Sequence, residues 1–116
     1  MRTIRFYRTQ SGRCPVEEFL ESLSPPHRKK VAWVLRVVEE LEVVPQQYMK
    51  KLVGSDGLWE IRSQIGGSSY RFLGFFDGAT ILILTRGFSK KQQKTPAQEI
   101  ELAIQRRKEY LGRKKS

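Results

Sequence analysis

Apolar and polar residues alternate at the start of the chain and then change to a helical spacing. In residues 3–8, Ile4 and Phe6 alternate with more polar residues, which predicts a strand with one face toward a core. Residues 15–23 begin with a proline that a first helical turn tolerates, and a Ser-Pro-Pro break separates them from residues 24–44. In the second segment the apolar positions fall on one helical face: Val31, Val34, Leu35, Val38 and Leu41. We therefore expect a strand followed by a hairpin of two helices.

Three apolar segments rich in β-branched and aromatic residues follow, at residues 58–65, 69–76 and 79–88. Gly66 and Gly67 separate the first two segments, and Asp77-Gly78 separates the last two. The Asp-Gly pair is a strong signal of a two-residue hairpin turn, because both central positions of a type I′ turn need a positive φ. The pattern predicts a three-stranded antiparallel meander.

A terminal helix is expected after the meander. Thr95 can cap it, with Pro96 at the first helical position and Gln98 reaching back as in a capping box. Its apolar stripe consists of Ile100, Ala103, Ile104 and Leu111. The order is thus β-α-α-β-β-β-α, an α+β fold in a single domain of residues 1–112, and the basic tail of residues 113–116 is expected to fray.

Composition narrows the class of protein. A chain of 116 residues supports one hydrophobic core, and a net charge of +10, from 22 Lys and Arg against 12 Asp and Glu, indicates a polyanionic partner. Half of the acids lie in the two expected helices, so the excess of positive charge is expected elsewhere. The single cysteine, Cys14, cannot form an internal disulfide, and no apolar run approaches the roughly 18 residues of a membrane span. We expect a cytoplasmic protein without a membrane partner.

Charged residues are expected to gather on one face of the meander. Alternation places Glu60 and Arg62 on the same face of one strand, and Arg71 on the neighbouring strand can lie about 5 Å from them. Arg86 stands near the end of the next strand and could join them. The simplest alternative is an Arg-Glu pair on the solvated face of a sheet.

The loop after the last strand favours a binding site instead. Residues 86–96 contain three lysines, Lys90, Lys91 and Lys94, and no carboxylate. The loop begins where the strand ends, so its ammonium groups would lie beside the arginines. The result would be a concave basic site lined by the ring of Tyr70 or Phe88.

Other common chemistries lack their residues. One cysteine and one histidine cannot build a zinc site, and neither a Walker loop nor a GxGxxG motif precedes a helix. His27 is better explained as a solvated residue at a helix start, Cys14 as a small buried residue, and the Gly-Gly-Ser-Ser sequence as a turn. No metal or cofactor is expected, and any acid-base groups must be Arg, Lys, Glu or Tyr.

Residues 58–107 resemble a known family. The similarity lies in three short motifs in a specific order: EIR, YR and F-x-KK-x-x-KTP before a terminal helix. They resemble the phage-derived, HigB-type branch of the RelE/ParE toxin superfamily. The resemblance implies a RelE-like fold and the toxin of a type II toxin–antitoxin system, a ribosome-dependent endoribonuclease that cuts translated mRNA. It implies a helix-turn-helix antitoxin (HigA-like) as partner, with operator DNA bound only through the antitoxin.

The resemblance also implies roles for individual residues. Arg71, in the YR motif, would hold the scissile phosphate, while Arg62 and Lys90 or Lys91 would share the proton transfers. Contacts to RNA or phosphate would come from Arg86, Lys94, Tyr70 and Phe88. Glu60 departs from the wholly basic pattern of some relatives and is a rival general base, because a carboxylate needs no shift in pKa to accept a proton.

Two further functions remain open. A ParE-like inhibitor would use the same scaffold to bind DNA gyrase without chemistry of its own, although such proteins generally lack the basic set. A non-toxic RNA-binding module would use the loop only to contact phosphates, with an affinity that falls steeply with salt.

Overall fold

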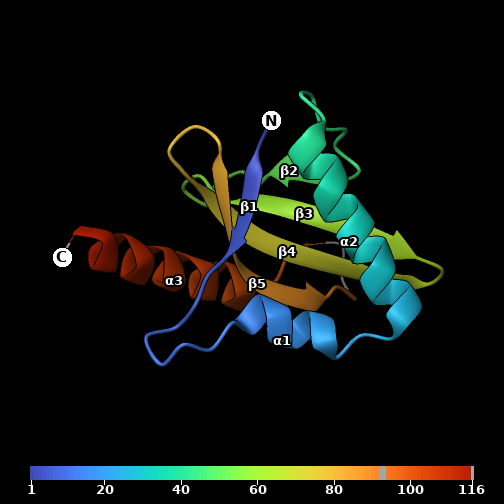
Figure 1. Cartoon of the computed structure of the whole chain (residues 1–116), viewed down its shortest axis with the longest axis horizontal. Coiled ribbons are helices and arrows are strands. Elements are labelled where there is room, and N and C mark those ends of the chain that lie inside the picture. The colour runs from blue at the N-terminus through green and yellow to red at the C-terminus, as the bar shows by residue number, and fades with distance from the viewer. Residues whose placement is uncertain (92–93, 116) are drawn as a thin grey trace.

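The computed structural model describes residues 1–91 and 94–115. Within this part of the chain, a five-stranded sheet is flanked by helices on both faces (Figure 1). The strands are β1 (Thr3–Phe6), β2 (Met49–Lys51), β3 (Trp59–Ile65), β4 (Ser68–Asp77) and β5 (Ile81–Ser89). The helices are α1 (Pro15–Glu21), α2 (Pro25–Glu40) and α3 (Ala97–Lys115). The α+β class is confirmed, but the predicted order lacked one strand.

The strand that sequence reasoning missed is β2, at the edge of the sheet. The spatial order is β1-β5-β4-β3-β2, and β2 pairs antiparallel with β3 through three residues. Two of these are lysines, so β2 has no apolar alternation and depends on backbone pairing with its neighbour. At the other edge, β1 is parallel to β5, with Thr3 opposite Ile81. The sheet is therefore mixed, and the expected antiparallel meander forms its centre.

Each face of the sheet has its own core. Helices α1 and α2 cover one face, α1 against β5 and α2 against β3, as Figure 1 shows on the side nearer the viewer. Buried valines of these helices pack there on the strands: Val16, Val31, Val34 and Val38 on Ile61, Phe72, Leu82 and Leu84. On the other face, α3 packs through Ala103, Ile100 and Ile104 on Leu58, Leu73, Phe75, Ile83 and Phe88. The predicted side-chain alternation of β3 and β4 is thus correct.

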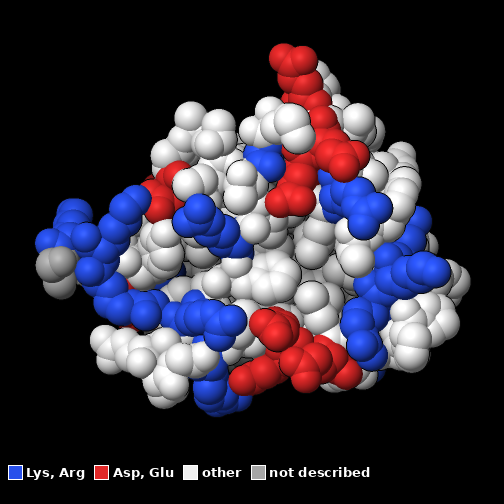
Figure 2. Space-filling view, viewed as in Figure 1, with Lys and Arg blue, Asp and Glu red and all other residues white. Residues whose placement is uncertain are grey.

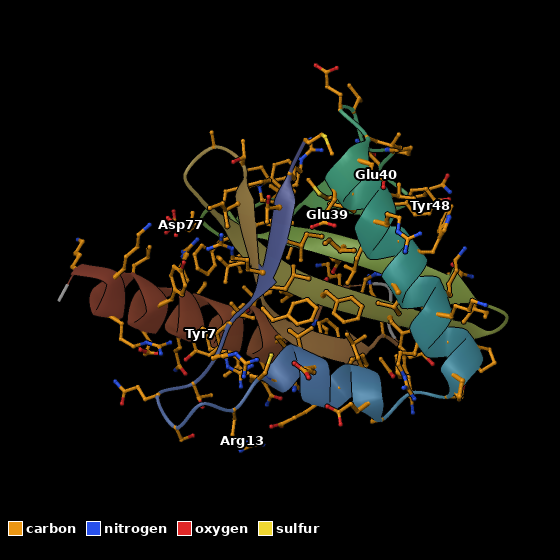
Figure 3. All side chains as sticks on the ribbon, viewed as in Figure 1. Tyr7, Arg13, Glu39, Glu40, Tyr48 and Asp77 are labelled. Carbon is orange, nitrogen blue, oxygen red and sulfur yellow. The ribbon has the colours of Figure 1, made fainter. Side chains whose placement is uncertain are left out.

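The first two helices end earlier than predicted. Helix α1 stops at Glu21, and α2 stops at Glu40, because Leu41 adopts an extended backbone conformation. The end of α2 is then tied to the first strand, since the carboxylate of Glu39 accepts a hydrogen bond from the backbone N–H of Ile4 at 2.9 Å. Figure 3 shows Glu39 between α2 and β1.

The two hairpin turns differ from each other. Ile65 pairs with Ser68, so Gly66 and Gly67 form a two-residue turn, with a φ of 57° at Gly66. The predicted two-residue turn at Asp77-Gly78 is wrong, because Asp77 still pairs with Ile81 and the connection is residues 78–80. Among the described residues of this connection only Gly78 has a positive φ, 79°.

A β-bulge interrupts the pairing of β4 with β5 between Leu73 and Gly74. A Cβ at Gly74 would lie 2.4 Å from the carbonyl oxygen of Ile83, so only glycine fits at this crossing. Beyond the bulge Arg86 lies opposite Leu73, on the face that α3 covers.

Both ends of α3 also differ from the prediction. The helix begins at Ala97, and the Thr95 hydroxyl donates a hydrogen bond to Glu60. The Thr95 hydroxyl thus bonds to β3 and does not form the expected capping box. The tail is helical through Lys115, and Lys114 binds Asp77 there. Leu111, predicted for the apolar stripe, is 38% exposed, and Tyr110 packs on the core in its place. Within the described residues, no helix has the length and apolar character needed to cross a membrane.

Candidate active site

A buried carboxylate lies at the centre of the candidate site. Glu60 of β3 is fully buried. Its Oε1 accepts a hydrogen bond from Arg62 Nε at 3.0 Å, and the Thr95 hydroxyl donates to its Oε2. Arg71 Nε lies 3.4 Å from Oε1. A buried carboxylate is costly unless it is paired, and Glu60 is paired from three directions.

The strand register brings these side chains together. Arg62 lies directly opposite Arg71 in the β3–β4 pair, and Glu60 is two residues from Arg62 on the same face. The short turn at Gly66 and Gly67 fixes this register. The meeting of Glu60, Arg62 and Arg71, which the alternation predicts, is therefore confirmed.

The guanidinium of Arg71 is held by residues of its own strand. Its Nη1 donates hydrogen bonds to Ser69 Oγ at 2.6 Å and to the Tyr70 carbonyl at 3.2 Å. Its Nε is buried without hydrogen-bond geometry, so the contact with Glu60 is an ion pair only. Burial lowers the pKa of Arg71, the charge of Glu60 raises it, and Arg62 lowers it. An arginine nevertheless keeps its proton in proteins, so Arg71 stays a cation.

Lys90 follows β5 directly. Its position is fixed by a backbone hydrogen bond, because its N–H donates to the Ser69 carbonyl at 2.8 Å. Burial is the main cause that lowers the pKa of its half-buried ammonium; Glu60 raises this pKa, and Arg71 and Arg62 lower it further. A hollow of about 170 Å³ lies beside it, between the β3–β4 turn and the start of the loop. Lys90 is thus next to both the cluster and an open space.

Within the described part of the chain, the other residues predicted for the site make no hydrogen bond or ion pair with the Glu60 carboxylate. Arg86 is on the same face but binds Glu99 of α3, at 2.7 Å from Nε and 3.3 Å from Nη2. Lys91 and Lys94 are exposed, and Lys91 lines the same hollow as Lys90. Residues 92 and 93 of the same loop lie outside the described part of the chain. Phe88 is buried in the α3 core, opposite Arg71.

Tyr70 points to the opposite face of the sheet from Arg71. Its ring packs in the core under α1 and α2, and its hydroxyl is 2.5 Å from His27 Nδ1. It therefore does not line the basic cluster. His27 is correspondingly half-buried against Tyr70, which corrects its interpretation as a solvated residue. Cys14 is buried, as expected.

Sequence reasoning missed three residues around Glu60. Ser69 binds Arg71, and the alternation of β4 places both on one face, so this partner could have been found. Lys50 lies opposite Glu60 in the ladder, but β2 itself was not predicted. Thr95 was interpreted as a cap because its sequence position suits one, and nothing in the sequence indicates a bond to β3.

The charge on the helical side is segregated into acidic and basic patches. Figure 2 shows acidic residues over the end of α2 and over α1, and basic residues over the first half of α2 and at the end of α3. Positive charge is therefore also present on α2, although the net charge of residues 15–44 does not reveal it. In residues 1–91 and 94–115, no three His, Cys, Asp or Glu side chains are grouped as metal ligands.

The family model described as "Phage derived protein Gp49-like (DUF891)" matches residues 18–108. The chain belongs to this Gp49-like family. Gp49-like proteins are in general RelE/HigB-like toxins, from a toxin–antitoxin-like family of endoribonucleases. The match covers the whole cluster around Glu60, including Lys90 and Thr95. A search of curated proteins finds no significant match.

Proposed function

We propose that this Gp49-like protein is the toxin of a type II toxin–antitoxin pair of the HigB type. It would act in the cytoplasm as a ribosome-dependent endoribonuclease that cuts translated mRNA. The observation that carries the proposal is the pairing of Arg62 and Arg71 with one buried carboxylate, whose charge also acts on Lys90, and Lys90 borders a hollow. A helix-turn-helix antitoxin (HigA-like) would neutralise the protein and alone contact operator DNA.

The cluster suits attack by the ribose 2′-hydroxyl on the adjacent phosphorus. The oxygen–phosphorus bond that forms gives a 2′,3′-cyclic phosphate, and the bond that breaks releases a 5′-hydroxyl. A base takes the 2′ proton, an acid protonates the leaving oxygen, and cations stabilise the added negative charge. Arg71 and Arg62 can supply the positive charge from fixed positions, and no cofactor enters these steps.

Lys90 is the better general base of the two candidates. Glu60 has no exposed surface, and both of its oxygens are engaged by Arg62, Arg71 and Thr95. A base must reach the 2′-hydroxyl, which a buried and fully paired carboxylate does not. Lys90 borders the hollow, and its lowered pKa leaves a larger neutral fraction to accept a proton. We assign Glu60 the task of orienting the two arginines.

Changing Lys90 tests this assignment. Lys90→Ala should slow single-turnover cleavage on programmed ribosomes by about 10²-fold. The wild-type rate should rise with pH, because only the neutral amine accepts a proton, and should level off above the pKa of Lys90. This pKa is lowered from the usual lysine value of about 10.4. Lys90→Arg keeps the charge but not the titration, so this rise should vanish. Lys91→Ala and Lys94→Ala serve as controls with smaller, salt-dependent losses; equal losses for all three lysines would contradict the assignment.

The function itself is tested by expression without the antitoxin. Growth should stop, and primer extension should detect new 5′ ends within translated mRNA shortly after induction. Untranslated transcripts in the same cells are the control and should stay intact. Loss of DNA supercoiling with intact transcripts would instead establish gyrase inhibition, and normal growth with RNA binding would establish a non-toxic binding module.

A further inference from the structure

A second hollow, of about 490 Å³, lies at the other end of the sheet, between β1 and the last turns of α3. Along β4, its wall at Asp77 is roughly 20 Å from Arg71, at the usual rise of an extended strand. It is therefore separate from the cluster around Glu60. Figure 2 shows basic residues gathered at this end of the molecule, where α3 ends.

The rim of this hollow is basic: Arg5, Arg8, Arg113 and Lys114. Its one acidic lining residue, Asp77, is already bound, because Tyr110 OH donates at 2.8 Å and Lys114 Nζ at 2.7 and 2.8 Å. These bonds fix the last turns of α3 against the end of β4. Figure 3 shows Asp77 and Tyr7 beside the α3 ribbon. The charge of Asp77 is thus neutralised by Lys114, and the other cations remain in excess.

Two of the arginines have donors to spare. The side chain of Arg5 is exposed and makes no hydrogen bond or ion pair with the residues that the structure describes, although its charge lowers the pKa of Asp77. Arg8 lies 3.9 Å from Glu17, and its Nη1 donates to the Gly12 carbonyl at 3.2 Å, but the Arg8 and Glu17 side chains are 61% and 54% exposed, so solvent makes these contacts weak. Arg113 is more firmly held, by Glu109 at 2.5 Å and by the carbonyl of Arg8. Arg5 and Arg8 are therefore the side chains that can turn toward an anion.

The wall of the hollow is apolar and aromatic. Half-buried Ile81 lines it together with Tyr7 and Tyr110, whereas the side chain of Phe6 packs in the core under α1 and α2. Each tyrosine hydroxyl is already bonded, Tyr7 to Glu109 and Tyr110 to Asp77, so the tyrosines offer ring surface more than free polar groups. The volume falls within the usual range of small-molecule sites, about 300–1,000 Å³. An apolar wall beneath a rim of guanidinium groups matches a planar base linked to a phosphate.

We propose that this hollow binds a nucleotide unit, with the base against Ile81 and Tyr110 and the phosphate between Arg5 and Arg8. The unit is either a free nucleotide or one residue of a single-stranded RNA. This binding is distinct from cleavage and does not depend on Arg71 or Lys90.

The test is a titration of the full-length protein by NMR, with AMP and with a short single-stranded RNA as probes. Backbone amides of Phe6, Tyr7 and Ile81 should shift and saturate. The Arg5→Gln/Arg8→Gln double variant should weaken binding at these amides by about tenfold or more. Arg36→Gln, which removes an exposed arginine on α2, is the control and should leave the affinity unchanged.

The two sources of the phosphate are separated by comparing the probes. Tighter binding of the RNA than of AMP at the same amides identifies an RNA strand, and equal or weaker binding identifies a free nucleotide. The proposal is overturned if neither probe shifts these amides saturably, or if Arg36→Gln weakens binding as much as the double variant does. Shifts confined to Arg71 and Lys90 would likewise overturn it while leaving the proposed cleavage site intact.

Discussion

Arg71→Ala is expected to slow single-turnover cleavage on programmed ribosomes by about 10³-fold, while the protein still folds. Arg71 presents a fixed, largely buried guanidinium in the cluster around Glu60, so its contact with the phosphate would strengthen as negative charge develops in the transition state. The side chain is only 14% exposed and needs little reorganisation to act.

Two further variants make the Arg71 result specific. Arg71→Lys keeps the charge but loses the planar fork that Ser69 orients, so it should recover only part of the activity. Arg86 lies on the same face but is paired with Glu99. Arg86→Ala should therefore reduce the cleavage rate much less than Arg71→Ala does. Circular dichroism and thermal melting should find Arg71→Ala folded. Full activity of this variant would mean that the cluster is an electrostatic surface without a catalytic arginine.

The second large effect is expected on stability. Glu60→Gln should lower the free energy of unfolding by about 3 kcal/mol, the lower end of the range for breaking a buried ion pair. The change leaves Arg62 and Arg71 facing each other without a counter-charge, at the directly opposed positions of β3 and β4. The lower end applies because solvent reaches the arginines in part, with Arg62 27% exposed.

Urea unfolding measures this loss, with Glu101→Gln as the control. Glu101 is exposed on α3, and its change should alter stability by less than about 0.5 kcal/mol. Urea unfolding and single-turnover cleavage together decide between the two roles of Glu60. If Glu60→Gln were as stable as the wild type but cleaved about 10³-fold more slowly, the carboxylate would be a base and not a counter-ion.

The central part of the site could be predicted because it depends on local geometry. Period-two alternation and a glycine turn suffice to place Glu60, Arg62 and Arg71 together, and both are visible in the sequence. Tyr70 was assigned to the same site although it neighbours Arg71 in a strand, where consecutive side chains point to opposite faces. Tyr70 does border the hollow beside Lys90, so its part in the site stays a prediction.

The remaining differences come from contacts between distant segments. Arg86 binds Glu99 because α3 lies over β5, and no local pattern reveals how a terminal helix packs. Thr95 reaches Glu60 for the same reason. β2 is short and basic, so only its pairing with β3 identifies it as a strand. Periodicity reports which face a residue occupies, whereas partners across the domain require the tertiary structure.

The parallel pairing of β1 with β5 constrains the order in which the protein can be completed during its own synthesis. Thr3 cannot pair until Ile81 has been synthesised, and Ile81 leaves the ribosome only after most of the chain has been made. Contacts between such distant positions slow folding, because a long loop must close before the pairing stabilises it. Lys90 and Thr95 emerge later still, so the cluster around Glu60 stays unfinished until synthesis is almost over. Under the proposed function, a nascent chain of this protein should thus be inactive on the ribosome that makes it.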